Sequence, residues 1–494
     1  MENATETPPS PLASFVRLAR DPARGRAPAF AWHTFERDPV TWSYARTYRA
    51  AAAAAAKLWR AVRARGEEPP RLSPLQTSPE HRAHCVGVFV SEGPGFLLLI
   101  LAVGLCGCAF VPLSKHDPPT RSAAAARAAA VSVIVVDDDD ANVAHGVVEA
   151  LETSTREGPR RSFGTDGNDA DTLTEGDDAK RHEHVAYEKR NETRGDARRE
   201  RVDVLRLSDV FDVGAFEDGE ACGEDGGARR RGETPTGETH LASALADLDL
   251  DACLERHPER VSHVFFTSGS TGTPKGCVAT RGALAWFAAG KRTTHGLDAS
   301  SVALVASPHV FDPSLGDVYA SLSAGGCVAL CPEAKVVSEL GACLLATNAT
   351  HLTATPTALG SVETSAEASE TENVFPSLRV VALGGEPTPR ALAETWAGRV
   401  PVLANTYGVT ECCVYQTFSR IDAGDAESRR RLGGGFPGVR AIHAAPPGDD
   451  PENVVDDDDD DDDDATGGDG TKQSRGVNLE RVRESSSLAE LWLA

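Results

Sequence analysis

The chain has 494 residues, and its formal net charge of -24 comes from 74 acidic and 50 basic residues. This length is sufficient for several domains or for one large domain with insertions. The acidic excess argues against nucleic acid as a partner, because its phosphates would be repelled. The 11 cysteines form no C-x-x-C pair and show no metal-like Cys/His spacing, so the sequence indicates neither a zinc site nor a disulfide framework. A reducing, cytoplasmic compartment is therefore expected.

The N-terminal segment carries acidic residues and lacks a continuous apolar stretch, so it does not resemble a secretory signal. One apolar run, "FLLLILAVGLCGCAFVPL" from Phe96 to Leu113, has about the length of a membrane span. Gly104, Gly107 and Pro112 interrupt this run. We therefore predict a buried helix that ends near Gly104, a strand "CAFVPL" after it, and no membrane span.

The segments around this run also show regular patterns. A helix is predicted for "YARTYRAAAAAAAKLWRAVRARG", with Ser43 as its cap and Gly66 as its stop. The strand "HCVGVFV" follows it. After "VSVIVVDDDD" the pattern dissolves, and residues 137 to about 240 are rich in Asp, Glu, Arg and Gly. Such a composition cannot bury enough apolar surface to order itself, so this segment is predicted to be a disordered, solvated insertion.

From residue 260 onward, short apolar strands alternate with helical segments. In chain order they are "HVFF", a helix from Arg281, "VALVA", a helix after Pro313, "CVAL", a helix near 337–346, "HLTA", "RVVAL", a helix near 390 and "PVLAN". This alternation predicts an α/β fold of layered, mainly parallel sheets with flanking helices.

Low-complexity sequence returns at about Ala444 and includes nine consecutive aspartates, Asp456 to Asp464. The run lacks the glycine turn and spaced ligands of a calcium-binding loop, so it is predicted to be disordered. The predicted organisation is the first part of the folded domain (1–136), the charged insertion (137–240), the core of the domain (241–443), an acidic disordered segment (444–485) and the start of a further motif (486–494).

The stretch "VFFTSGSTGTPKG", residues 264–276, follows a buried strand and precedes a helix. Its glycines allow the backbone N–H groups to approach a ligand closely, and its hydroxyl side chains add further donors. Lys275 adds a positive charge, so the loop is suited to phosphate oxygens. The kinase-type P-loop ends in Gly-Lys-Ser/Thr, whereas the order here is Pro-Lys-Gly, so that motif is excluded.

Four further stretches occur in a fixed order: "ASPHVFDPS", "ALGGEP", "ANTYGVTE" and the terminal "AELWLA". Together with "FTSGSTGTPKG" they resemble the core motifs of the adenylate-forming, or AMP-binding, superfamily. This superfamily includes acyl-CoA synthetases, luciferases and the adenylation domains of nonribosomal peptide synthetases. "FDPSLGDVYASLSAGG", "HLTATPTAL" and "SLRVVALGGEP" are most similar to its aminoadipate-semialdehyde-dehydrogenase-like, or β-alanine-activating, branch. The resemblance covers roughly residues 40–136 and 258–443.

The resemblance implies roles for individual residues. The β- and γ-phosphates of ATP would be held by Thr267, Ser268, Gly269, Ser270, Thr271, Gly272, Thr273, Lys275 and Gly276. The remaining nucleotide contacts would come from Gly384, Gly385 and Glu386 at the adenine edge, Tyr407 at its face, and Asn405 and Gly408 beside them. Thr410 would meet the α-phosphate, and Glu411 would ligate Mg²⁺, a hard cation suited to carboxylate and phosphate oxygens. Lys275, Thr410 and Glu411 would be the catalytic residues.

Two residues bear on the substrate. Amino-acid-activating members of the superfamily have an aspartate at the position of Asp312, where it pairs with the amino group of the substrate. A buried carboxylate in that place would exclude fatty acids, because it would be left without a partner. The alternative is that Asp312 and the following proline start a turn and cap the next helix. His309 is expected at the wall of the acyl pocket.

The implied reaction is the activation of a carboxylic acid as its acyl-adenylate, with ATP and Mg²⁺ as cofactors and pyrophosphate as product. The expected substrate is an amino acid or β-amino acid, and the acceptor would be CoA or the phosphopantetheine of a carrier protein. Two alternatives remain open, an acyl-CoA synthetase for a small carboxylic acid and a non-catalytic nucleotide-binding homologue.

The second alternative arises because the superfamily pattern continues beyond "AELWLA". A Thr-Gly-Asp turn that holds the ribose, a hinge and a C-terminal domain with a lysine that supports adenylation would follow there. No residue of this chain matches them, so the resemblance implies a C-terminally truncated member.

Overall fold

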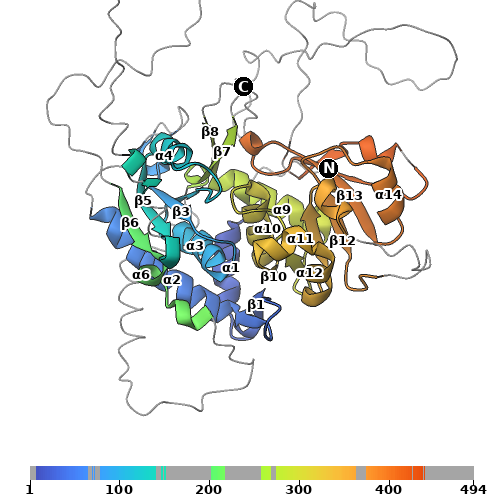
Figure 1. The fold of residues 1–494 in the computed structure, drawn as a ribbon, viewed down its shortest axis with the longest axis horizontal. Coiled ribbons are helices and arrows are strands. Elements are labelled where there is room, and N and C mark those ends of the chain that lie inside the picture. Colours follow the sequence, from blue (N-terminus) through green and yellow to red (C-terminus); the bar gives the residue numbers. More distant parts are fainter. Residues whose placement is uncertain are drawn as a thin grey trace, which may run out of the picture.

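The computed structural model describes residues 7–64, 69–70, 72, 78–140, 146–147, 149–151, 202–216, 257–268, 274–362, 374–425, 427–437 and 439. Two mainly parallel sheets organise these residues, and Figure 1 shows helices between and around them. The nine-stranded sheet has the order β15 (Gly434–Gly435), β14 (Thr417–Arg420), β13 (Val402–Tyr407), β12 (Val380–Leu383), β11 (His351–Ala354), β9 (Val302–Leu304), β10 (Cys327–Leu330), β1 (Pro28–Trp32) and β2 (Val40–Ser43). The six-stranded sheet has the order β6 (Asp203–Arg206), β5 (Val131–Val136), β3 (Cys85–Phe89), β4 (Ala109–Pro112), β7 (Val261–Ser268) and β8 (Pro274–Thr280).

Helices cover both faces of each sheet. They are α1 (Pro11–Arg20), α2 (Tyr44–Arg63), α3 (Pro94–Leu105), α4 (Pro119–Ala128), α6 (Leu207–Val210), α9 (Arg281–His295), α10 (Asp312–Ser323), α11 (Glu333–Ser338), α12 (Leu340–Thr347), α13 (Pro356–Gly360) and α14 (Arg390–Trp396). The largest hydrophobic core joins α1, α2, α3, α9 and α10 to one face of both sheets. Smaller cores cover the opposite faces, with α12 and α14 on the larger sheet and α4 on the smaller one. The predicted layered α/β fold is confirmed.

Strand β3 shows why parallel strands in such a fold are apolar along their whole length. Val86 and Val88 face the central core, whereas Cys85 and Phe89 face the core under α4. Because successive side chains point to opposite faces, a strand covered by helices on both sides needs apolar residues at every position.

The helix and strand predictions before residue 136 are confirmed. Helix α2 begins at Tyr44, and the Ser43 hydroxyl accepts a hydrogen bond from the backbone N–H of Arg46 across 3.3 Å. The predicted stop, Gly66, lies outside the described residues. The apolar run forms the buried helix α3 followed by β4, as predicted. In the part of the chain that the structure describes, no helix is long and apolar enough to cross a membrane.

Parts of the predicted disordered insertion are ordered, so that prediction was wrong for residues 202–216 and for Val147 and Leu151, which are buried in the core under α4. Strand β6 extends the smaller sheet by parallel pairing with β5. Leu207, Val210 and Phe211 are buried in the central core directly after it. This short apolar pattern lies between long charged segments, so the average composition of the insertion does not reveal it. The other parts of the insertion lie outside the described residues, apart from 137–140, 146–147 and 149–151, and so do the acidic segment and the end of the chain.

Candidate active site

Strands on either side of the predicted phosphate loop, β7 and β8, form a hairpin. Strands β7 and β8 pair antiparallel, with Thr267 opposite Lys275 and Ser268 opposite Pro274. The strand before the loop and the helix from Arg281 are present as predicted, but strand β8, which the sequence analysis did not predict, lies between the loop and α9. Lys275 and Gly276 therefore lie in a strand, where both are exposed. The tip residues Gly269, Ser270, Thr271, Gly272 and Thr273 lie outside the described residues.

The second part of the site lies at the carboxyl ends of β12 and β13. These strands pair in parallel with Leu383 opposite Asn405, so the segments that follow them lie side by side. Gly384 is required by this packing, because a Cβ atom there would lie 2.6 Å from the Thr406 Oγ1 atom. Gly385 has a φ of 83°, a left-handed conformation that glycine adopts without strain. The "GGE" and "TYG" segments, to which the resemblance assigns the adenine, thus lie side by side at the carboxyl ends of two paired strands.

The side chains at this edge differ in accessibility. Tyr407 is 50% exposed, so its ring is available to a ligand. The Glu386 carboxylate instead accepts hydrogen bonds from the Thr357 hydroxyl at 2.6 Å and from the Thr357 N–H at 3.2 Å. Asn405 is buried, and its Nδ2 donates to the Arg431 carbonyl oxygen across 3.1 Å. Asn405 therefore holds the strand to the segment after β14 rather than presenting its amide to a ligand.

The third part of the site is the turn after β13. Gly408 precedes a 3-10 turn, η5 (Thr410–Cys412), which packs against strand β8 of the hairpin. A Cβ atom on Gly408 would lie 2.4 Å from the Val414 carbonyl oxygen, so only glycine allows the chain to fold back here. Glu411 is exposed at this turn. The "YGVTE" motif and the hairpin that carries Lys275 are therefore adjacent in space.

Asp312 connects α10 to this turn. It is the first residue of α10, and its carboxylate accepts a hydrogen bond from the backbone N–H of Val414 across 3.0 Å. Only 6% of Asp312 is exposed. Burial is the main cause that raises its pKa to about 6, and the negative charge of Glu411 raises it further, whereas the Val414 N–H and the Thr410 side chain lower it. The carboxylate is thus ionised at neutral pH inside a largely apolar site.

The side chain of His309 contacts other segments of the chain. Its Nδ1 is 2.6 Å from Glu92 Oε1, and its Nε2 is 3.3 Å from the Leu113 carbonyl oxygen. Burial opposes ionisation of Glu92, but the hydrogen bond and charge of His309 lower its pKa to about 2. Both ring nitrogens of His309 therefore contact protein groups, and the ring joins α3 and the end of β4 to the segment before α10.

Two residues of the site have no counterpart in the sequence prediction. Cys277 lies in β8 on the same face as Lys275, and burial followed by the charge of Glu411 raises the pKa of its thiol to about 11. This cysteine is therefore a protonated wall residue and not a nucleophile. Tyr415 packs against Phe287 with ring centroids 6.4 Å apart, and burial and the charges of Asp317 and Asp312 raise its pKa. The alternation of side chains along β8 is the signal that identifies Cys277.

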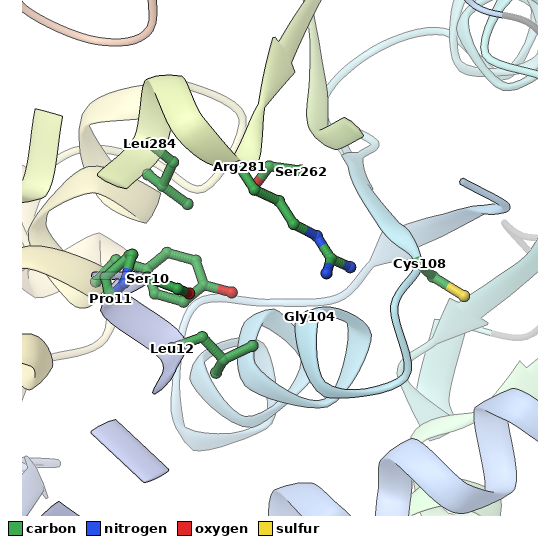
Figure 2. Close-up of a pocket in the computed structure, with 9 residues that line it drawn as sticks. Ser10, Pro11, Leu12, Gly104, Cys108, Ser262, Arg281 and Leu284 are labelled. Carbon is green, nitrogen blue, oxygen red and sulfur yellow. The ribbon is translucent and has the colours of Figure 1, made fainter. Parts of the chain in front are cut away.

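A small cavity elsewhere in the molecule is not part of this site. It lies between the start of α1, α3 and α9, and Figure 2 shows the Arg281 side chain extending into it above Gly104. Its volume of about 20 Å³ accommodates one water molecule but not a substrate. The candidate site therefore consists of the hairpin, the two strand ends and the start of α10.

The donor atoms at the site fit a magnesium nucleotide. Glu411 supplies an exposed carboxylate, and the hydroxyls of Thr267 and Thr410 lie on the two segments that meet there. Oxygen ligands of this kind suit Mg²⁺ together with phosphate oxygens. The exposed Lys275 amine adds a positive charge to these oxygen donors, and such a combination of groups is chemically suited to phosphate.

Comparison with curated proteins identifies fungal relatives over part of the chain. The nonribosomal peptide synthetase GRA1 of Gibberella zeae is 35% identical over 190 residues, which are 38% of this chain and 2% of that protein. The nonribosomal peptide synthetase agiA of Aspergillus flavus is 36% identical over 190 residues, again 38% of this chain and 2% of that protein. This chain thus spans a small fraction of the length of these relatives.

Solved structures share the fold. The AMPPNP-bound form of the nonribosomal peptide synthetase FmoA3 matches 88% of this chain and 36% of its own, with a TM-score of 0.56 and 16% identity. The Vibrio cholerae adenylation domain AlmE, in complex with glycyl-adenosine-5'-phosphate, matches 86% of this chain and 63% of its own, with a TM-score of 0.54 and 16% identity.

The family comparison covers most of the chain. Residues 75–452 match the family model of the AMP-binding enzymes. The match includes the hairpin, the start of α10, both strand ends and the "YGVTE" turn, whereas the terminal "AELWLA" lies beyond it. The chain therefore belongs to the AMP-binding enzyme family.

Proposed function

We propose that this chain activates an amino acid by joining its carboxylate to the AMP portion of ATP. A carboxylate oxygen attacks the α-phosphorus of ATP, the bond from that phosphorus to the bridging oxygen breaks, and pyrophosphate leaves with the electron pair. Negative charge then builds on phosphate oxygens, and preorganised donors stabilise it. Family membership supports the reaction class, and two of the relatives are named as nonribosomal peptide synthetases.

One observation favours an amino acid over a fatty acid. Asp312 is a buried carboxylate at the site, and Glu411, a second negative group, raises its pKa further. A substrate ammonium group would supply the missing positive charge, whereas an aliphatic acid would leave the carboxylate buried and without a counter-ion. We therefore assign Asp312 to the substrate amino group.

The other residues take the roles that their positions permit. Lys275, Thr267 and Ser268, with the tip of the hairpin and Gly276, bind the β- and γ-phosphates. The adenine edge is formed by residues that contact the base or support those that do, namely Gly384, Gly385, Glu386, Asn405 and Gly408. Tyr407 stacks on the base. Thr410 donates to the α-phosphate, and Glu411 holds Mg²⁺. When bound, Mg²⁺ would neutralise charge on the phosphate oxygens. His309, through Glu92, supports the wall of the acyl pocket.

The acceptor of the activated acid is assigned by chemistry alone. An acyl-adenylate is a mixed anhydride, and a thiol displaces AMP from it to form a thioester. We propose the phosphopantetheine of a carrier protein, in line with the relatives named as peptide synthetases, and CoA as the alternative acceptor.

The test is amino-acid-dependent exchange of pyrophosphate into ATP by the full chain. The acids are β-alanine, α-aminoadipate, the common amino acids and short fatty acids. We expect exchange with an amino or β-amino acid, its loss in Lys275→Ala, and no change in Lys335→Ala, which removes an exposed lysine paired with Glu339 outside the site. Exchange with fatty acids alone would contradict the substrate class. Saturable ATP binding without any exchange would show a nucleotide-binding homologue and overturn the proposed activation.

A further inference from the structure

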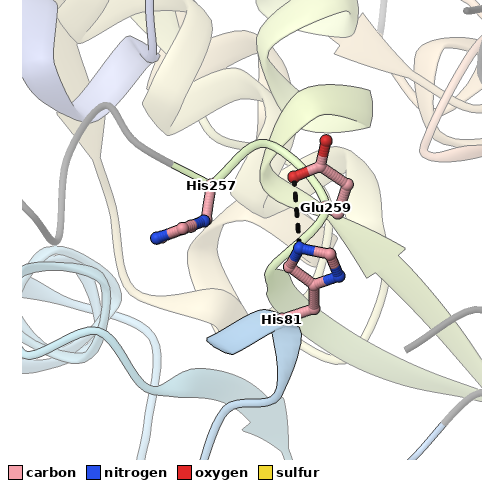
Figure 3. Close-up of side chains that lie close together, drawn as sticks. All are labelled: His81, His257 and Glu259. Atoms are coloured by element: carbon pink, nitrogen blue, oxygen red, sulfur yellow. Dashed lines mark ion pairs between the residues drawn. The ribbon is translucent and has the colours of Figure 1, made fainter. Parts of the chain in front are cut away.

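A group of metal-ligating side chains lies apart from the nucleotide site. His81 is the last residue of the 3-10 turn η2 (Pro79–His81), and His257 and Glu259 lie in the turn that precedes β7. The ligand atoms of the three side chains all lie within 4.8 Å of one another. Figure 3 shows His81 and Glu259 facing one another across the two segments, with His257 beside them and its ring extending to the left. The imidazole Nε2 of His81 is 3.9 Å from the Glu259 Oε2 atom, and the two imidazole rings have centroids 6.1 Å apart.

The backbone around these side chains is held firmly. The Arg260 Nε atom donates to the Arg82 carbonyl oxygen across 3.0 Å, which ties the turn before β7 to the residue after η2. The N–H of Gly282 donates to the Pro258 carbonyl oxygen across 2.7 Å, so the same turn is fixed to the start of α9. The two ligand-bearing segments therefore keep a fixed separation without a metal, and binding needs to order side chains only.

The side chains can reach a common metal ion. Four ligands around zinc at about 2.0–2.1 Å are about 3.4 Å apart in tetrahedral geometry, so the separations of the three ligand atoms must shorten by about 0.5 Å to at most about 1.4 Å. Glu259 is exposed and both histidines are partly exposed, so solvent reaches all three side chains. His257 also lines an open hollow of about 390 Å³ beside α9 and the start of α1, which gives solvent access to the site.

We propose that His81, His257 and Glu259 bind a zinc ion with a water molecule in the fourth position. Two imidazoles with one carboxylate suit Zn²⁺ and its neighbours among the transition metals, whereas Mg²⁺ and Ca²⁺ prefer oxygen ligands only. The ion would join η2 to the start of β7, the strand that ends in Thr267 and Ser268. This site is independent of amino acid activation, because none of its ligands belongs to the nucleotide site.

The first experiment measures Zn²⁺ affinity of the full chain by competition with a chromophoric chelator at pH 7.5. We expect one tight site per chain and a loss of affinity of about 100-fold or more in His81→Ala, His257→Ala and Glu259→Gln. His116→Ala is the matched control, because His116 is exposed beside the single carboxylate of Glu333 at 3.5 Å. Unchanged affinity in His81→Ala and His257→Ala, or an equal loss in His116→Ala, would overturn the proposal.

Two further measurements separate this site from other sources of binding. Co²⁺ in place of Zn²⁺ should give a visible spectrum without thiolate charge-transfer bands, since the proposed ligands contain no cysteine; such bands would contradict the assignment. Zinc should also raise the thermal unfolding midpoint of the parent chain but not of His257→Ala. With a chelator present the two proteins should unfold at the same temperature, and a lower midpoint for His257→Ala there would show a structural role of the imidazole instead.

Discussion

The carboxylate of Asp312 accepts a hydrogen bond from the backbone N–H of Val414 across 3.0 Å, although the two residues lie in different elements of the chain. Val414 has a φ of 68°, and Cys413 before it has a φ of 67°. A β-branched residue in the left-handed region is strained, so the surrounding contacts must hold the turn in place. Asp312 therefore has two structural roles. It begins helix α10, and its carboxylate supports the "YGVTE" turn.

Asparagine at position 312 separates these two roles. In Asp312→Asn the side-chain oxygen can still accept from Val414, but the charge that would pair with an ammonium group is lost. We expect kcat/KM for the amino acid to fall by about 10- to 100-fold, which corresponds to the free energy that a hydrogen bond to a charged group contributes. At neutral pH Asp312→Asn should be more stable than the parent, because it keeps the acceptor without the buried charge, and Asp312→Ala should be less stable than Asp312→Asn, as measured by urea unfolding. Equal kcat/KM in the parent and Asp312→Asn would rule out the amino-group role.

The raised pKa of Asp312 predicts a pH dependence. Because its pKa is about 6 in the folded protein, the carboxylate loses its charge as the pH falls through that value. Amino acid kcat/KM should therefore be constant above pH 7 and fall tenfold per pH unit well below 6. The profile of the free enzyme should show this step in the parent and lack it in Asp312→Asn. A step of the same size in both proteins would assign it to another group.

The folded state should also respond to this group. A carboxyl whose pKa is higher in the folded than in the unfolded state favours folding when protonated. The contribution of Asp312 is thus fully present below its ordinary value of 3.8 and is lost as the pH rises through about 6. Between these two values the Asp312→Asn variant should become progressively more stable relative to the parent, which urea unfolding at a series of pH values would show.

Gly408 allows a test of the close contact beneath the turn. In Gly408→Ala the new methyl group would meet the Val414 carbonyl oxygen and the Tyr415 Cα at 2.4 Å, and both are backbone atoms that cannot rotate away. The turn that bears Thr410 and Glu411 must shift, so nucleotide affinity and exchange should both fall by tenfold or more, roughly the effect of a 1.4 kcal/mol loss. Gly360→Ala is the control, since nothing lies within 4 Å of a Cβ atom there. ATP affinity measured by calorimetry should be unchanged in the control.

The sequence predicts the parallel strands and their helices well because each apolar run is bounded by clear turn signals. Strand β8 was missed because "PKGCVAT" has few apolar residues, and its pairing with β7 holds it in the extended conformation. Residues 202–216 were missed because their apolar pattern is short and surrounded by charge. Cys277 and Tyr415 were missed because neither residue type indicates a nucleotide site, and only folding brings them beside Asp312. The proposed zinc ligands were missed for a similar reason, since His81 and His257 lie on segments far apart in sequence.

A buried ion pair below the site offers the last test. Lys291 of α9 and Asp317 of α10 are each 3% exposed in their side chains and pair directly. The Lys291 ammonium also donates to the Thr353 hydroxyl across 2.8 Å, and the same hydroxyl donates to Asp317 across 3.2 Å. The second carboxylate oxygen of Asp317 has no hydrogen-bond partner among the described residues. Burial raises the pKa of Asp317, and the charge of Lys291 opposes that rise.

Removal of one partner leaves an uncompensated buried charge. We expect Lys291→Met to lower the free energy of unfolding by about 3–5 kcal/mol at pH 7, whereas the double variant Lys291→Met with Asp317→Leu should recover most of this loss. Lys335→Met, which removes one partner of the exposed pair with Glu339, should cost only about 0.3–0.5 kcal/mol. The defect of Lys291→Met should shrink as the pH falls, because protonation of Asp317 removes the uncompensated charge. A double variant as unstable as Lys291→Met would show that packing around the lysine stem, and not charge, sets the cost.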